Sequence, residues 1–267
     1  MRSATTSAEP ARPGFGDFYR VNRGGGLFSE AVSQRLGAAI ALAAHRLGLS
    51  PTTLTVANVL LGLAISSVVV AAAERTGAGA PPWTIGLLAL VGWQVAYGLD
   101  CADGQLARVT GRTSAAGARV DVLCDVAAQI GLVTALSAVA VAVRPTTPVW
   151  LVAAFAGTWM VNLVTSVMQS GPAAASMVTS TALPVRVVKL IRDYGAVITA
   201  AGLVLTVAPR GTPWLIAAFT VINGGFLLAS IAFAARRAHS AASGPATDSA
   251  AGGAADHASG QARATSR

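Results

Sequence analysis

The 267-residue chain is 54% hydrophobic and 11% charged, and its mean hydropathy is +0.61. Soluble proteins are about 45–50% apolar and 25% charged, so this composition excludes a soluble multidomain enzyme and indicates one integral membrane domain. The net charge of +8 is not accompanied by a patch of interleaved aromatic residues. It therefore favours a basic cytoplasmic edge over a nucleic-acid surface.

The first part of residues 1–28 is expected to be disordered. The remainder, in which aromatic residues and arginines are mixed, is expected to lie on the membrane surface. A juxtamembrane amphipathic helix is predicted over 29–47, with Ser29 as its N-cap. Because its apolar stripe contains few large side chains, this helix is expected to lie in the interface and not to span. The stripe consists of Val32, Leu36, Ala39, Ile40 and Ala43.

The stretch 48–236 predicts an all-α fold, a polytopic membrane bundle of six transmembrane helices preceded by the amphipathic helix. Each span is close to the roughly 20 residues that a bilayer core requires. The composition of 237–267 is typical of a disordered tail. The spans are predicted at about 52–73, 83–108, 115–142, 148–169, 184–208 and 213–235.

The distribution of basic residues predicts the orientation of these spans. If the N-terminus is inside, only three of the 19 Lys and Arg residues fall in outer loops, namely Arg75, Arg144 and Arg210. Both termini are therefore expected in the cytoplasm, and the chain is expected in the cell (plasma) membrane.

Four aspartates lie within two of the predicted spans, where an ionisable side chain costs about 2.5–3.5 kcal/mol and indicates a functional site. Asp100 and Asp103 are i,i+3 neighbours, and Asp121 and Asp125 are i,i+4 neighbours, so each pair projects from one helix face. The short link between the spans could bring these faces together near the cytoplasmic side. Hard divalent cations prefer oxygen ligands, so the pattern predicts a metal site.

The spacing D-x2-D-G-x2-A-R-x8-G-x3-D-x3-D, complete within 26 residues, resembles the signature of the CDP-alcohol phosphatidyltransferases. The resemblance implies transfer of a phosphatidyl or related group from a CDP-linked donor, such as CDP-diacylglycerol, to an alcohol in phospholipid biosynthesis, with release of CMP. It also implies two divalent cations, Mg²⁺ or Mn²⁺, held by Asp100, Asp103 and Asp121. Asp125 is expected to be the general base and is also counted among the metal ligands.

The resemblance also implies roles for other residues of this chain. Gly104 and Gly117 would remove side chains where the two helices face each other, so that backbone or nucleotide can approach closely. Arg108 can make a bidentate contact to a phosphate. A basic group at the start of the fifth span could hold an anionic acceptor. The residues assigned to the donor are Thr55, Asn58, Gly104, Ala107, Arg108 and Gly117, and those assigned to the acceptor are Arg112, Arg119, Arg186, Lys189 and Arg192.

Other interpretations of these residues remain open. The aspartates could be helix-end carboxylates paired with arginines, the fifth-span basic group could be a membrane anchor, and Thr55 and Asn58 could join helices by hydrogen bonds. An intramembrane prenyltransferase also uses Asp-x-x-Asp pairs on Mg-diphosphate, but on well-separated helix pairs. A cation or proton transporter would spread its acids across the bilayer and contain an inverted repeat.

The expected partners follow from the leading interpretation. They are a CDP-diacylglycerol-like lipid, a small alcohol or polyol phosphate, membrane lipids and a second copy of the chain in a homodimer. No nucleic acid is expected. The identity of the acceptor alcohol is not indicated by the sequence.

Overall fold

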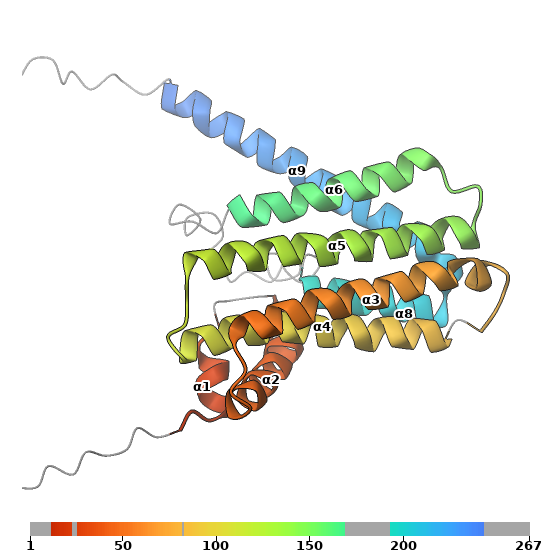
Figure 1. The fold of residues 1–267 in the computed structure, drawn as a ribbon. Coiled ribbons are helices and arrows are strands. Elements are labelled where there is room, and N and C mark those ends of the chain that lie inside the picture. The colour runs from red at the N-terminus through yellow and green to blue at the C-terminus, as the bar shows by residue number, and fades with distance from the viewer. Residues whose placement is uncertain (1–11, 23–25, 82, 169–192, 243–267) are drawn as a thin grey trace, which may run out of the picture. The chain divides into compact units, whose positions relative to one another are not determined.

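The computed structural model describes residues 12–22, 26–81, 83–168 and 193–242. Every regular element in these ranges is helical, and no strand occurs there, so the predicted all-α class is confirmed (Figure 1). The chain divides into two compact units, Met1–Gly224 and Gly225–Arg267, and the candidate site lies in the first.

In the described part of the chain, four segments are long and apolar enough to cross a membrane. They are α3 (Pro51–Gly77), α4 (Trp83–Val109), α5 (Ala115–Val143) and Pro209–Ala232, which runs through the short 3₁₀ turn η3 (Pro209–Gly211) into α9 (Thr212–Ala242). Two predicted spans correspond to shorter apolar helices, in α6 (Val149–Met168) and in α8 (Tyr194–Val207). The predicted count of six spans is therefore supported for four.

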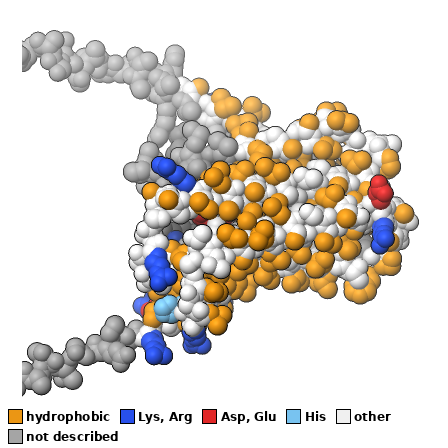
Figure 2. Space-filling view, in the orientation of Figure 1, with side chains coloured by type: hydrophobic (Ala, Val, Ile, Leu, Met, Phe, Trp, Pro, Cys, Tyr) orange, Lys and Arg blue, Asp and Glu red, His pale blue; other side chains and the backbone are white. Residues whose placement is uncertain are grey.

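The distribution of side chains on the surface agrees with a membrane protein. Figure 2 shows hydrophobic side chains over most of the visible middle of the molecule, with Lys and Arg gathered towards one end. Charged groups at an end and apolar groups between are what a chain with its helices in a bilayer requires.

Helices α3 and α5 begin at hydroxyl caps. The Ser50 side chain accepts a hydrogen bond from Thr53 N at 3.1 Å, and the Ser114 side chain accepts one from Gly117 N at 3.0 Å. Between α4 and α5 the chain reverses at Gly111, whose φ of +67° favours glycine. This tight turn brings the end of α4 next to the start of α5.

The bundle is built on α3, which packs against both α4 and α5, while α8 packs against α4 (Figure 1). The contact between α4 and α8 is very close, because a Cβ added to Gly86 would overlap the backbone of Thr206. Small residues at helix contacts allow such close approach in membranes. A core of buried apolar side chains, including Val69, Leu136 and Ile198, fills the space between these helices.

The segment before α3 folds onto α4. It contains α1 (Phe15–Arg20), a π-helical turn η1 (Ser29–Ser33) and α2 (Gln34–Arg46), and the fully buried Phe18 packs with α2 and α4. The prediction that Ser29 caps the juxtamembrane helix is wrong. Ser29 is the first residue of the π-helical turn, and its hydroxyl donates to the carboxylate of Asp193 instead.

The predicted apolar stripe is packed only in part, because Leu36 and Ile40 lie against Gly98 of α4. Val32 is 44% exposed, whereas Gly37 and Ala41 are buried. A Cβ added to Gly37 would lie 2.7 Å from the Cβ of Cys101 on α4, so the two helices touch through small residues. The contact with α4 therefore combines small residues at the point of closest approach with the larger side chains of Leu36 and Ile40.

Candidate active site

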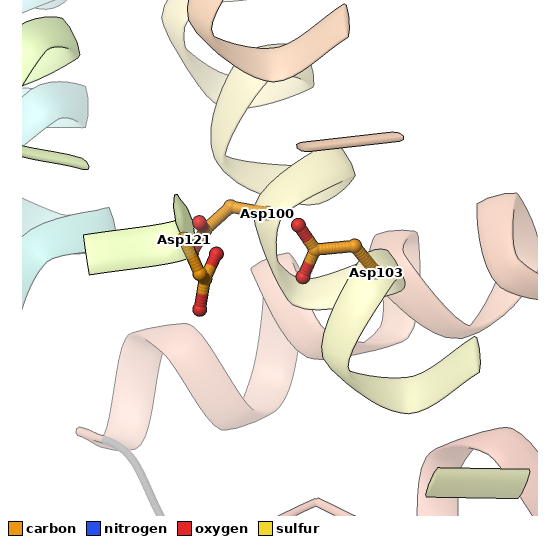
Figure 3. Close-up of side chains that lie close together, drawn as sticks. All are labelled: Asp100, Asp103 and Asp121. Carbon is orange, nitrogen blue, oxygen red and sulfur yellow. The ribbon is translucent and has the colours of Figure 1, made fainter. Parts of the chain in front are cut away.

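Three carboxylates from two helices meet in the first unit. Asp100 and Asp103 lie in the C-terminal half of α4, Asp121 lies near the start of α5, and one oxygen of each lies within 4.8 Å of the other two. Figure 3 shows the three side chains directed towards one another. The structure thus brings together three of the four predicted aspartates.

The carboxylate group fits a divalent cation. Oδ1 of Asp121 is buried and has no hydrogen-bond partner among the described residues. An unsatisfied buried acceptor costs about 1–3 kcal/mol, and a bound cation would remove that cost. The other two carboxylates are held in place, because Asn58 Nδ2 donates to Asp100 Oδ1 at 3.3 Å and Thr55 Oγ1 donates to Asp103 Oδ2 at 2.5 Å. An all-oxygen donor set of this kind suits Mg²⁺ or Mn²⁺.

Asp125 is not one of these three clustered carboxylates, but it forms a hydrogen bond with Asp100. It lies one turn further along α5 and, with Asp100, lines a cavity of about 20 Å³ that we call the inner cavity. A cavity of this size holds about one water molecule or one hydroxyl group. Its polar side chains are Asn58, Tyr97, Asp100, Asp125 and Tyr194.

A larger pocket of about 540 Å³, the outer pocket, lies at the starts of α3 and α5 and the end of α4. Asp103 and Asp121 line it, whereas Asp100 and Asp125 line the inner cavity. The aspartates therefore divide a large pocket from a small one. The outer pocket is also lined by Ser50, Pro51, Thr52, Thr55, Gly104, Ala107, Arg108, Arg112, Ser114 and Gly117.

The two motif glycines line the outer pocket. A Cβ added to Gly104 would lie 3.0 Å from Nη1 of Arg108, so the glycine lets this guanidinium lie against its own helix. A Cβ added to Gly117 would meet only Ser114 Oγ within 4 Å. The prediction allowed close approach of either backbone or nucleotide at these glycines, and their place in the wall of the outer pocket leaves approach of a nucleotide as a prediction.

The remaining predicted residues are distributed over several places. Thr55 lines the outer pocket, whereas Asn58, assigned to the same donor site, lines the inner cavity. Arg112 lines the outer pocket, and Arg119 is exposed and lines neither space. The predicted acceptor residues Arg186, Lys189 and Arg192 lie outside the described residues.

Sequence reasoning missed the two tyrosines of the inner cavity. Tyr97 precedes Asp100 by three residues on α4, so the helical spacing that paired the aspartates also places this tyrosine on the same face. Tyr194 comes from α8, far away in the sequence, and its ring meets that of Tyr97 edge-on with centroids 4.9 Å apart. No local pattern indicates the position of Tyr194.

The bond from Thr55 to Asp103 gives a first test of the metal site. Thr55→Val keeps the side-chain shape and removes the donor that orients Asp103, so we expect Mn²⁺ affinity to fall about 10–100-fold. The measurement is a Mn²⁺ titration followed by electron paramagnetic resonance. Thr76→Val is the matched control on the same helix, because Thr76 only donates to the carbonyl of Ala72. Equal affinities in both variants would contradict the orienting role.

Comparison with known proteins identifies one family. The model of the CDP-alcohol phosphatidyltransferase family matches residues 48–236, which is more than half of the chain and includes all four aspartates. No curated protein gives a significant match, and no solved structure does.

Proposed function

Because the chain belongs to the CDP-alcohol phosphatidyltransferase family, we propose that it transfers a phosphatidyl or related group from a CDP-linked lipid, such as CDP-diacylglycerol, to an alcohol, with release of CMP. The observation that carries the proposal is the meeting of Asp100, Asp103 and Asp121 between two pockets. The larger pocket has the volume of a typical small-molecule site and two arginines in its wall.

The outer pocket is suited to the nucleotide and phosphates of the donor. Arg108 and Arg112 supply positive charge there, and the N-terminal ends of α3 and α5, where the helix dipole is positive, line the pocket. Thr55 and Asn58 fix the carboxylates of Asp103 and Asp100 by hydrogen bonds. Two divalent cations held by Asp100, Asp103 and Asp121 would neutralise the charge of the donor's pyrophosphate.

Asp125 is the proposed general base. It removes the proton from the acceptor hydroxyl, whose oxygen then forms a bond to the phosphorus that bears the lipid. The bond from that phosphorus to the oxygen of CMP breaks, and CMP leaves with the electron pair. The place of Asp125 beside a cavity of one-hydroxyl size supports this role.

The proposal includes an arrangement in the membrane. We place six spans in a catalytic domain of residues 48–236, a juxtamembrane segment at 29–47 and a tail at 237–267. In this arrangement both termini and the active site lie on the cytoplasmic side of a cell membrane, since only three of the 19 basic residues fall in the predicted outer loops. A small alcohol or polyol phosphate is the proposed acceptor, bound with the help of Arg112, Arg119, Arg186, Lys189 and Arg192, and the enzyme is proposed to be a homodimer.

The decisive experiment measures CMP release by the purified full chain from labelled CDP-diacylglycerol. We expect release with at least one member of a panel containing glycerol phosphate, inositol phosphate and uncharged alcohols. Removal of divalent metal with EDTA should abolish it, and Mg²⁺ or Mn²⁺ should restore it. No CMP with any acceptor, together with turnover of a prenyl diphosphate, would contradict the proposal and favour an intramembrane prenyltransferase.

A further inference from the structure

A buried hydrogen-bonded network connects the segment before the family-matched domain to the inner cavity. It joins η1, α4 and the start of α8, and Ser29, Ser33 and Asp193 are each at most 4% exposed. The site described above uses none of these three residues. Hydrogen bonds join Ser29 to Tyr97 and to Asp193, and a separate hydrogen bond joins Ser33 to Gln94.

The carboxylate of Asp193 accepts hydrogen bonds from η1 and from the start of α8. Its carboxylate accepts from Ser29 N at 2.8 Å, from the Ser29 hydroxyl, and from Gly195 N and Ala196 N at 3.0 and 3.4 Å at the start of α8. The chain lies tightly against it, because a Cβ added to Gly26 would overlap the carboxylate. The Ser29 hydroxyl has one proton, and this proton is committed to Asp193.

This commitment decides the direction of the next hydrogen bond. The oxygens of Ser29 and Tyr97 are 3.0 Å apart, and Ser29 has no proton left for this contact. Tyr97 therefore donates to Ser29, and its oxygen presents only lone pairs on its other sides. Tyr97 lines the inner cavity together with Asp100 and Asp125. A group that enters the cavity thus meets an acceptor at Tyr97.

We infer that Ser29 and Asp193 are positioning residues that hold Tyr97 so that its oxygen accepts a hydrogen bond from the acceptor alcohol's hydroxyl beside Asp125. This inference rests on the proposed function. It adds that residues before 48, outside the family match, form part of the catalytic unit, because Ser29 acts there through Tyr97.

Removal of the Ser29 hydroxyl would reverse the polarity of the cavity wall. Without its partner, the proton of Tyr97 would turn to another acceptor, and the carboxylate of Asp100 lines the same cavity. The Tyr97 hydroxyl would then present its proton to the cavity, at the place where the alcohol's hydroxyl needs a hydrogen-bond acceptor. The net free energy of one hydrogen bond corresponds to a factor of about 2–12 in a rate constant, so we expect kcat to fall about fivefold to tenfold. The KM for the donor in the outer pocket should not change.

The test is a double-mutant cycle on CMP release with Ser29→Ala, Tyr97→Phe and the double variant. If Ser29 acts through Tyr97, the double variant is as slow as Tyr97→Phe alone, whereas independent effects would multiply. Ser33→Ala is the matched control, because it removes the other buried hydroxyl of the same turn, bonded to Gln94 at 3.5 Å. We expect it to match Ser29→Ala in thermal midpoint and the unmodified chain in kcat. The inference would be overturned if the effects of Ser29→Ala and Tyr97→Phe on kcat multiplied in the double variant, or if the two serine variants had equal kcat.

A second measurement does not depend on activity. Infrared spectra of protein labelled at its three tyrosines identify the C–O band of Tyr97 by its loss in Tyr97→Phe. We expect this band to shift in Ser29→Ala and to stay in place in Ser33→Ala. An unchanged band in Ser29→Ala would overturn the inference even if the protein released no CMP. Absent CMP release from the unmodified protein, with the shift present, would instead refute the proposed function.

Discussion

Asp125→Asn is expected to lower CMP release by about 10²–10⁴-fold, which is the usual contribution of a positioned general base. Asparagine has nearly the same size as aspartate but does not take up a proton. Asp125 is not one of the three clustered carboxylates, although it forms a hydrogen bond with Asp100. An asparagine can keep a hydrogen bond to Asp100, so divalent metal should still bind. The measurements are kcat at saturating CDP-diacylglycerol and a Mn²⁺ titration of the same preparation.

Glu74→Gln is the matched control for this variant. Glu74 lies in the last turn of α3, lines neither the outer pocket nor the inner cavity, and should leave both readouts unchanged. A retained rate in Asp125→Asn would remove Asp125 from the role of base. A lost rate accompanied by lost Mn²⁺ binding would instead identify Asp125 as a fourth metal ligand.

The convergence of the aspartates could be predicted from sequence because it depends on local geometry. Spacings of three and four residues place each pair on one helix face, and a short link with Gly111 at its turn brings the two helices together. These relations hold within a few turns of helix and need no knowledge of distant segments. The same reasoning would have found Tyr97, three residues before Asp100.

The parts of the site that escaped prediction depend on the packing of distant segments. Ser29 and Asp193 are 164 residues apart, and their contact follows from how η1 fits against α8. Thr55 and Asn58 share one face of α3, yet they lie in different spaces because the carboxylates of α4 separate the outer pocket from the inner cavity. A single sequence does not indicate which side of such a boundary a side chain will occupy.

Asp121→Asn is the second variant with a large expected effect. Changes to groups that only orient a ligand cost about 10–100-fold in metal affinity, so loss of a ligand itself should weaken Mn²⁺ binding by at least about 100-fold. CMP release should be lost in parallel. Asp17→Asn, at an exposed carboxylate of α1 paired with Arg20, is the control and should bind Mn²⁺ as the unmodified chain does.

The thermal stability of Asp121→Asn separates a metal ligand from a structural carboxylate. Asp121 faces two like charges, which repel it, and the guanidinium of Arg108, which attracts it, so neutralising Asp121 should leave the stability of the metal-free protein about unchanged. A ligand that binds only the folded state raises the melting temperature, and this gain with Mg²⁺ or Mn²⁺ should disappear in the variant. A structural carboxylate would give the opposite pattern, with a lower melting temperature without metal and an unchanged rise with it. That result, together with unaltered Mn²⁺ affinity, would exclude Asp121 from the metal site and remove the basis for the proposed reaction.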